Sequence, residues 1–271
     1  MKFLSMGHSY NYLVCPQTNF DKIKNKIKIK NMKHFLTSMI IACAVFTTQA
    51  QTSWINWEFN VPPQKQEAFV GALNTFFTSE TGKKLPMVYL TEQTLGNNEV
   101  THHVSVLSED ADGIGKMLDP SNWQKNEDYQ AMGQAMTDLG TLPLRSFTGM
   151  PVAQSSQKGN GFQIIYSMNV PFDQIMPITE TFQNLVKTMQ PLLNEVSAEM
   201  SLSQHIAGDD RGVTHYAVES HKSYAHYLKA QNRLMQAPEF GKMFETMGKG
   251  NITNPNTTAR TMLMMWNAPK E

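Results

Sequence analysis

Cysteine is almost absent from this chain of 271 residues, and its position excludes several kinds of chemistry. Both cysteines, Cys15 and Cys43, fall before residue 51. Residues 51–271 therefore contain no thiol for a disulfide, a zinc–thiolate site, an iron–sulfur cluster or a cysteine nucleophile. The same residues also lack a phosphate-cradling glycine loop, a nucleophile elbow and a dinucleotide-binding motif.

Positive charge is also scarce once the N-terminal region is set apart. Seven of the 23 lysines and arginines, but only one of the 23 acidic residues, fall within residues 1–50, so residues 51–271 carry a net charge of −6. An acidic chain without a basic block is a poor partner for nucleic acid or for an anionic membrane surface. No segment after residue 50 is apolar for long enough to cross a membrane. We therefore expect no nucleic-acid partner and no transmembrane segment.

Residues 32–50 have the layout of a secretory signal peptide. Lys33 and His34 form a short basic region, an apolar stretch covers 35–46, and Thr48-Gln49-Ala50 places small residues at the −3 and −1 positions of a cleavage site. We expect cleavage after Ala50 and an exported protein, periplasmic or extracellular.

Two alternatives concern this N-terminal region. The segment Ile40-Ile41-Ala42-Cys43 loosely fits a lipoprotein cleavage box, which leaves anchoring through Cys43 as an alternative to ordinary cleavage. Because the signal is complete from Met32, residues 1–31 are interpreted as a mis-set start. An extended N-terminal region is the other interpretation.

The remaining residues contain an internal repeat with a period near 110. Four short matches occur in the same order along the two copies, with offsets that drift only slightly. They join Asn60-Val61-Pro62 to Asn169-Val170-Pro171, Val100-Thr101-His102 to Val213-Thr214-His215, Met132 and Met136 to Met243 and Met247, and Arg145 to Arg260.

Each copy contains the same predicted elements. A strand with alternating apolar residues ends at a proline and precedes an amphipathic helix, which Pro191 should end or kink in the second copy. Two short strands then flank a polar turn, a second helical region follows, and a strand closes the copy. The opening and closing strands are expected at 54–61, 144–152, 162–170 and 258–266, and the second helical regions at 112–118, 128–139, 222–230 and 238–247.

The order β-α-β-β-α-β is that of the ferredoxin-like unit. We therefore predict an α+β fold with two tandem ferredoxin-like repeats, over residues 51–157 and 158–271. Since helices cover one face of each four-stranded sheet, the other face is expected to be apolar and covered by the sheet of the other copy. The two sheets would form a barrel-like pseudo-dimer within one chain, and further oligomerisation is left open.

The second helical region carries a family likeness. Tyr224-Ala225-His226-Tyr227-Leu228 is followed by Ala237-Pro238-Glu239-Phe240, which gives an aromatic–Leu pair, a short acidic loop and a Phe that opens the next helix. This pattern resembles the dimeric α+β barrel superfamily, which includes the antibiotic-biosynthesis monooxygenase-like proteins. The likeness spans residues 52–267 as a layout. It implies a fold more than an activity, because the superfamily includes cofactor-free oxygenases, haem-degrading enzymes and isomerases.

The haem-degrading branch can be tested on the residues themselves. Its members place a haem-ligating histidine one helical turn after the conserved Phe, and the corresponding positions here are Phe244 and Gly133. Neither side chain can ligate iron. We expect no cofactor.

The repeat singles out His102 and His215 as candidate site residues. Strand alternation places each on an apolar face beside neighbouring valines. Each is either a buried, hydrogen-bonded residue or a residue of a ligand pocket, and both interpretations remain open. No further metal-ligand spacing accompanies the pair, so no metal is expected.

Trp57 and Tyr166 occupy equivalent positions of the two opening strands, on the same apolar face. They would stack a planar apolar ligand if the interior holds a cavity, and they would fill the core if it does not. Glu58, on the opposite parity, is either an acid/base group or a solvated residue. His103 is expected at the surface or facing a helix. Three further histidines are expected at the surface: His205, His221 and His226.

The leading functional prediction is the binding of a small molecule in the cavity between the sheets. Its candidate contacts are Trp57, His102, Tyr166 and His215, and a cofactor-independent oxygenase or isomerase reaction would extend it. The alternative is a non-catalytic exported protein that serves as an interaction scaffold. No residue identifies a substrate, a catalytic group or a partner protein.

Overall fold

A computed structural model describes residues 52–96, 99–155, 160–208 and 212–268. The predicted signal segment 32–50, Cys15, Cys43 and the central residues of both polar turns lie outside the described residues. Within the described ranges, none of the helices combines the length and the apolar character needed to span a membrane.

The two halves of the chain, 52–155 and 160–268, run through their elements in the same order. The first half contains β1 (Ser53–Phe59), α2 (Gln66–Phe77), β2 (Met87–Leu95), β3 (His102–Ser108), α3 (Ala111–Leu118), α4 (Pro120–Lys125), α5 (Glu127–Asp138) and β4 (Arg145–Gln154). The second half contains β5 (Phe162–Asn169), α6 (Ile175–Glu195), β6 (Glu199–Gly208), β7 (His215–His221), α7 (Tyr224–Leu234), α8 (Pro238–Lys249) and β8 (Thr253–Trp266).

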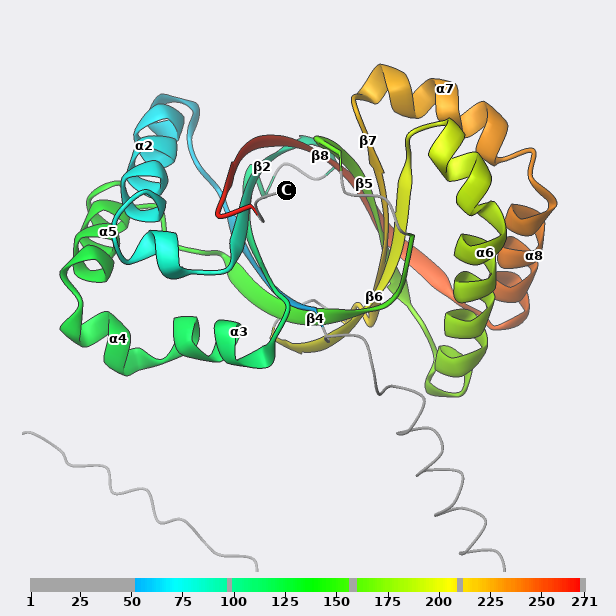
Figure 1. Cartoon of the computed structure of the whole chain (residues 1–271), viewed down its shortest axis with the longest axis horizontal. Coiled ribbons are helices and arrows are strands. Elements are labelled where there is room, and N and C mark those ends of the chain that lie inside the picture. Colours follow the sequence, from blue (N-terminus) through cyan, green and yellow to red (C-terminus); the bar gives the residue numbers. More distant parts are fainter. Residues whose placement is uncertain (1–51, 97–98, 156–159, 209–211, 269–271) are drawn as a thin grey trace, which may run out of the picture. The chain divides into compact units, whose positions relative to one another are not determined.

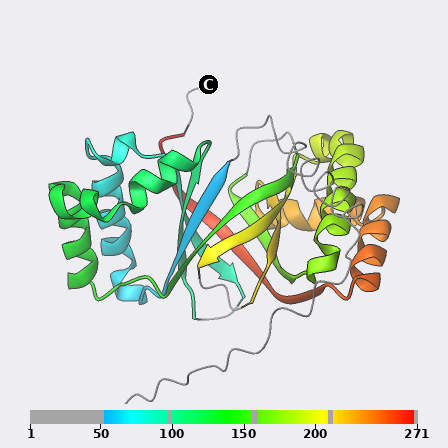
Figure 2. The same cartoon turned by 90° about the horizontal axis from the view of Figure 1, so that it is seen from below.

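The eight strands close into one antiparallel barrel in the order β1-β3-β2-β8-β5-β7-β6-β4 (Figure 1). Each half contributes four neighbouring strands, and the halves join edge to edge where β2 pairs with β8 and β4 pairs with β6. The helices of the two halves lie on opposite sides of the barrel (Figure 2). Closure leaves no unpaired edge among these strands.

The strand face that lines the barrel interior is not the face that the sequence predicted. In β1, Ile55 and Phe59 pack beneath the helices with Phe69 of α2, whereas Trp54 and Asn56 line the interior of the barrel. The prediction that each apolar sheet face is covered by the other sheet is therefore wrong. The apolar faces lie under the helices, and the more polar faces line the barrel.

The long helix α6 continues past Pro191 to Glu195. Of the two predicted effects of Pro191, an end of the helix is therefore wrong, and a kink stays a prediction. Proline removes one backbone donor and leaves the carbonyl four residues earlier without a helical partner. Pro191 and Lys187 both lie on the exposed face of α6, where water can hydrate that carbonyl. The buried face of the helix stays continuous.

The closing strand of each half reaches the core of the other half. At the end of β8, the indole Nε1 of Trp266 donates to Asn74 Oδ1 of α2 at 3.1 Å, and its ring lies 4.8 Å from that of Phe77. At the end of β4, Val152 packs against the second-half core, and Gln183 of α6 donates to its carbonyl oxygen at 3.0 Å. Each core is therefore completed by the other half.

Inside the barrel, Trp54 meets Phe147 and Tyr216 at ring-centroid distances of 5.9 and 5.7 Å. Gly149 lies opposite Trp54 in the β1–β4 pairing. A Cβ at Gly149 would lie 2.3 Å from an indole carbon of Trp54 and 2.7 Å from the carbonyl oxygen of Gln204. The missing side chain makes room for the indole.

Candidate functional site

His102 and His215 open β3 and β7 on the side that faces the helices. They are only 1% and 0% exposed, and the ring of His102 stands edge-on to Phe69 of α2 at 5.5 Å. The structure therefore places neither histidine in the barrel interior, where the sequence analysis expected a cavity. Their role as ligand contacts stays a prediction.

The repeated Val-Thr-His segment has the same structural use in both halves. Thr101 Oγ1 accepts from the backbone N–H of Val61 at 2.8 Å and lies 2.9 Å from His102 Nδ1. Thr214 Oγ1 makes the same two contacts in the second half, at 2.8 Å and, to His215 Nδ1, at 3.0 Å. Each threonine thus links the end of one strand to the start of another, and its histidine supports the link.

Trp57 and Tyr166 lie in different surroundings despite their equivalent positions. Trp57 packs against the aromatic-rich core of the first half. Tyr166 lines a cavity of about 230 Å³ between the barrel and the helices of the second half. Of the four candidate residues, Tyr166 alone contacts this helix-covered cavity.

The walls of the helix-covered cavity are predominantly apolar. They come from strands β5, β6, β7 and β8, from helices α6, α7 and α8 and from the residue that follows α7. The apolar lining residues are Met168, Ile178, Phe182, Met200, Ala217, Val218, Met235, Phe240, Met243, Phe244 and Met247. Methionine side chains are flexible and polarisable, so such a wall can adapt to the shape of a ligand.

Three polar residues that line this cavity, Tyr166, Glu219 and Gln231, lie close together, with His221 and Tyr227 beside them. Glu219 of β7 is 5% exposed, and its Oε2 accepts from Gln231 Nε2 of α7 at 2.5 Å. His221 Nε2 lies 3.4 Å from the same oxygen. The hydroxyls of Tyr166 and Tyr227 lie 3.5 Å apart. A buried carboxylate with these neighbours can orient a ligand that carries a polar atom.

Burial, and then the negative charge of Glu219, raises the pKa of Tyr166 far above its ordinary value. The phenol therefore keeps its proton at neutral pH. It can donate a hydrogen bond to a ligand oxygen while Glu219 accepts one.

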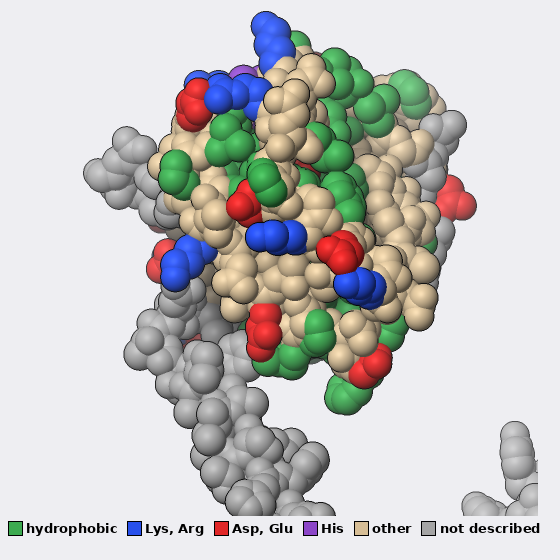
Figure 3. Space-filling view, turned by 90° about the vertical axis from the view of Figure 1, so that its right-hand side faces the viewer, with side chains coloured by type: hydrophobic (Ala, Val, Ile, Leu, Met, Phe, Trp, Pro, Cys, Tyr) green, Lys and Arg blue, Asp and Glu red, His purple; other side chains and the backbone are tan. Residues whose placement is uncertain are grey.

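The helix-covered cavity opens to the surface beside Met235 and Phe244. Both residues line it, yet they are 52% and 48% exposed. Figure 3 looks onto this side of the molecule and shows hydrophobic side chains at the surface among charged ones. A ligand can enter here without unfolding the barrel.

Sequence reasoning missed Glu219 and Gln231. Glu219 shares its strand parity with His215 and Ala217, so a carboxylate on an otherwise apolar face was an available signal. Gln231 gave no such signal, because one glutamine on a helix is unremarkable until its partner is known. The expectation that His221 lies at the surface is wrong, because it is 0% exposed.

Two residues expected near solvent lie inside the barrel instead. His103 is 0% exposed and Glu58 is 3% exposed, with His103 Nδ1 3.6 Å from Glu58 Oε1. Glu58 Oε2 accepts from Arg145 Nε of β4 at 2.5 Å. The expectation of a surface or helix-facing His103 is therefore wrong, and so is the solvated alternative for Glu58, whose acid/base alternative stays a prediction. Closing the barrel buried the more polar strand face, and an arginine compensates the carboxylate.

Within the part of the chain that the structure describes, no group of three or more His, Cys, Asp or Glu side chains is placed to hold a metal ion.

No protein-family model matches the chain, and no curated protein matches it in sequence. Solved structures do match. A “putative monooxygenase” from Fusobacterium nucleatum is 14% identical, with a TM-score of 0.55 over 83% of this chain and 98% of its own. One of the same description from Lactobacillus acidophilus is 6% identical, with a TM-score of 0.56 over 80% and 96%. An anthrone oxidase-like protein is 8% identical, with a TM-score of 0.55 over 83% and 96%.

The fold is that of the dimeric α+β barrel proteins. At such low identity the likeness extends to the fold and not to the activity.

Proposed function

We propose that the protein binds a small, mostly apolar molecule in the helix-covered cavity of the second half. The observation that carries the proposal is an adaptable, methionine-rich wall with Glu219 and Tyr166 placed together in it. Sites for small molecules typically combine apolar walls with a few polar groups that fix orientation. The structural neighbours described as monooxygenases and as anthrone oxidase-like support an organic molecule as the ligand.

For catalysis, the cavity offers Glu219 as a base. A cofactor-independent oxygenase or isomerase begins by removing a proton from its substrate. The Glu219 carboxylate would accept this proton, Gln231 would hold the carboxylate in place through its 2.5 Å contact, and the Tyr166 phenol would donate to a substrate oxygen.

The neutral, planar fluorophore 1-aminoanthracene tests the binding site. We expect saturable binding of one molecule per chain, with enhanced fluorescence. Ala217→Leu adds side-chain volume to the cavity wall and should weaken binding at least about tenfold. Ala131→Leu, on the exposed face of α5, makes the same change away from the cavity and should leave binding unaltered. Undiminished binding by Ala217→Leu would place the ligand elsewhere.

Glu219→Gln separates binding from catalysis. The amide keeps the size of the side chain but cannot take a proton, so 1-aminoanthracene binding should persist while any turnover of a host-derived ligand stops. Native mass spectrometry of the protein purified from its own host would identify that ligand. Binding without turnover in the wild-type protein would remove the enzyme proposal, and no binding at all would favour the interaction scaffold.

The proposal includes export of the protein. It rests on the signal layout of residues 32–50, with cleavage after Ala50. The intact mass of the exported form should correspond to a chain that begins at Gln51. A chain that begins at Cys43 with an added lipid mass would instead favour the anchored alternative.

A tandem duplication of a ferredoxin-like unit is the proposed origin of the two halves. The shared β-α-β-β-α-β order supports it. So do the matching threonine–histidine contacts at His102 and His215.

A further inference from the structure

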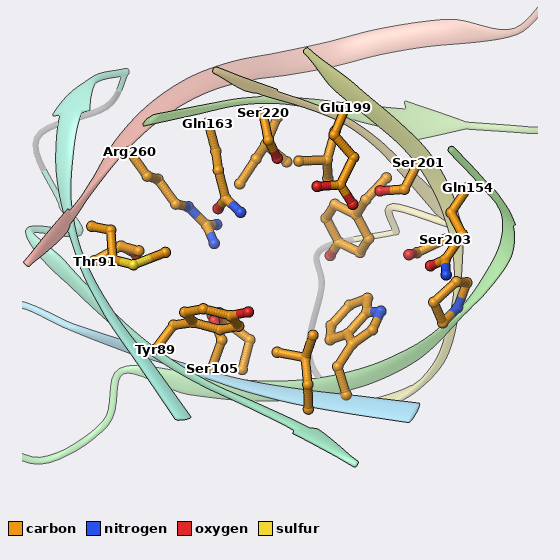
Figure 4. Close-up of a pocket in the computed structure, with 18 of the residues that line it drawn as sticks. Tyr89, Thr91, Ser105, Gln154, Gln163, Glu199, Ser201, Ser203, Ser220 and Arg260 are labelled. Atoms are coloured by element: carbon orange, nitrogen blue, oxygen red, sulfur yellow. The ribbon is translucent and has the colours of Figure 1, made fainter. Parts of the chain in front are cut away.

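A second cavity, of about 200 Å³, lies inside the barrel, and many hydroxyl and amide side chains line it together with aromatic and aliphatic ones. Figure 4 shows Arg260 and Gln163 pointing into it on one side, with Tyr89 and Ser105 opposite and Glu199 farther along. None of these side chains belongs to the helix-covered cavity. Polar walls of this kind suit a ligand with several hydrogen-bonding atoms.

At the end of this cavity where Arg260 lies, positively charged side chains outnumber negatively charged ones among the described residues. Glu58 accepts directly from Arg145 at 2.5 Å, whereas Arg260 Nη2 lies 3.9 Å from Glu58 Oε1. Burial, and then the two arginines, lowers the pKa of His103 well below its ordinary value, so His103 is neutral at neutral pH. Among the residues that the structure describes at this end, two guanidinium groups therefore share one carboxylate. In the second half, Ser167 stands where Glu58 stands in the first.

Buried donors at this end also lack acceptors. Arg260 is 9% exposed and Asn56 is 3% exposed, and both line the cavity. Within the described residues, Arg260 Nε and Asn56 Nδ2 have no hydrogen-bond partner. A buried donor without an acceptor is costly and marks a place where a ligand oxygen or a water can bind.

The far part of the cavity offers a different set of groups. Glu199 lies there near Ser201 and Ser203 (Figure 4), and its Oε2 has no partner among the described residues. Burial raises the pKa of Glu199 to about 7. At neutral pH about half of this group is therefore protonated, and in that form it both donates and accepts hydrogen bonds, as the serine hydroxyls do.

We infer that the barrel interior is a second binding site, for a small hydroxylated carboxylate whose carboxylate pairs with Arg260 and whose hydroxyl groups meet Glu199 and the serines. The surplus positive charge at the Arg260 end suits a monoanion better than a phosphate, which carries about 1.5 to 2 negative charges at neutral pH. The cavity is smaller than the roughly 300–1,000 Å³ of drug-sized sites, which limits the ligand to about the size of a six-carbon chain.

Calorimetry with gluconate and sorbitol tests the site, because the two molecules share a hydroxylated six-carbon chain and only gluconate carries a carboxylate. We expect saturable binding of gluconate by the wild-type protein, with a Kd of about 1 mM or tighter, and binding of sorbitol at least about tenfold weaker. Equal affinity for the two, no binding of gluconate, or tighter binding of inorganic phosphate would overturn the proposal.

Arg260→Gln localises the site. It should weaken gluconate binding at least about tenfold, whereas Arg260→Lys, which keeps the charge, should retain part of the affinity. Arg233→Gln makes the same change at an exposed arginine of α7, 53% exposed and paired with Glu195, and should have no effect. Unchanged gluconate binding by Arg260→Gln would overturn the assignment. Should that variant fail to fold, Ser203→Ala decides, because a loss of affinity of about threefold is expected and no loss contradicts the site.

Displacement experiments separate this inference from the proposed function. Gluconate should not displace 1-aminoanthracene, because the two ligands would occupy different cavities. Failure of fluorophore binding alone would contradict the proposed function and leave the barrel site intact, and failure of gluconate binding alone would do the reverse. Competition between the two ligands would overturn the separate barrel site.

Discussion

The two helical layers share an order of elements but differ in what fills them. Under α2 and α5, aromatic rings lie against one another, with Phe76 4.9 Å from Tyr129 and Phe77 4.8 Å from Trp266. Under α6 and α8, the corresponding space is walled by methionines and holds a cavity of about 230 Å³. Rigid rings fill a layer, whereas flexible thioethers leave room that can adapt. One architecture therefore provides a packed core on one side and a candidate binding site on the other.

Neither half should fold stably alone, because each core is completed by the other half. A fragment covering residues 51–157 tests this most directly. In the fragment, β2 and β4 lose their partners β8 and β6, and the first-half core loses Trp266. We expect aggregation or self-dimerisation, because two strand edges and apolar surface are exposed. Light scattering after size-exclusion chromatography would show it. A stable monomeric fragment would contradict the requirement for both halves.

Trp266→Ala tests the contribution of β8 to the first half and should have the next largest effect. Removing a buried indole together with its hydrogen bond to Asn74 should lower the free energy of unfolding by about 3–5 kcal/mol. Val152→Ala is the matched change at the end of β4. It should cost only about 1 kcal/mol, because less volume is lost. Urea unfolding of both variants measures the difference, and equal losses would show that the two closing strands contribute alike.

His102 and His215, which occupy equivalent positions in the two halves, should make the stability of the protein depend on pH to different extents. Burial, and then His205, lowers the pKa of His215 to about 4. The unfolded chain binds this proton near pH 6.5, so the stability contribution is complete above pH 6.5 and is lost as the pH falls toward 4. The loss is at most about 3 kcal/mol. His215→Leu should remove this acid sensitivity.

His102→Leu should change acid sensitivity less. Burial also lowers the pKa of His102, but Glu92 opposes the shift. Urea unfolding at pH 4 and pH 7 would compare the two variants with the wild-type protein. The same samples, titrated with 1-aminoanthracene at pH 7, would show whether either histidine contacts a ligand. Unaltered fluorophore affinity in both would leave the histidines a structural role only.

Gly149→Ala examines an asymmetry inside the barrel, where the first half places Trp54 and the second half places Gln163 at the equivalent position. The added Cβ would meet the indole at 2.3 Å, so we expect a loss of about 1–3 kcal/mol. Gly241→Ala, on α8, meets nothing within 4 Å and should gain about 0.5–1 kcal/mol from helix propensity. Thermal melts would measure both stability changes. An undiminished Tm for Gly149→Ala would show that Trp54 can move aside.

The sequence predicted the elements of both halves well because periodicity and turn residues report local structure. The phenylalanines of α2 and the apolar residues of α6 lie buried as their helical spacing predicts. The cavity could not be predicted in the same way. Alternation along β1 and β3 separates two faces, but it does not say which face meets helices and which closes into a barrel. Choosing the wrong face for the interior led to wrong surroundings for Glu58 and His103. Glu219 could have been noticed from its strand parity, but its contact with Gln231 joins two elements and could not be predicted.

The position of Trp266 at the end of β8 determines when the first-half core can finish folding. The hydrogen bond from Trp266 to Asn74 joins residues 192 positions apart in the chain. During synthesis, the first half therefore emerges early but must wait for almost the whole chain before its core is complete. Long-range closure of this kind slows folding and prolongs the exposure of apolar surface.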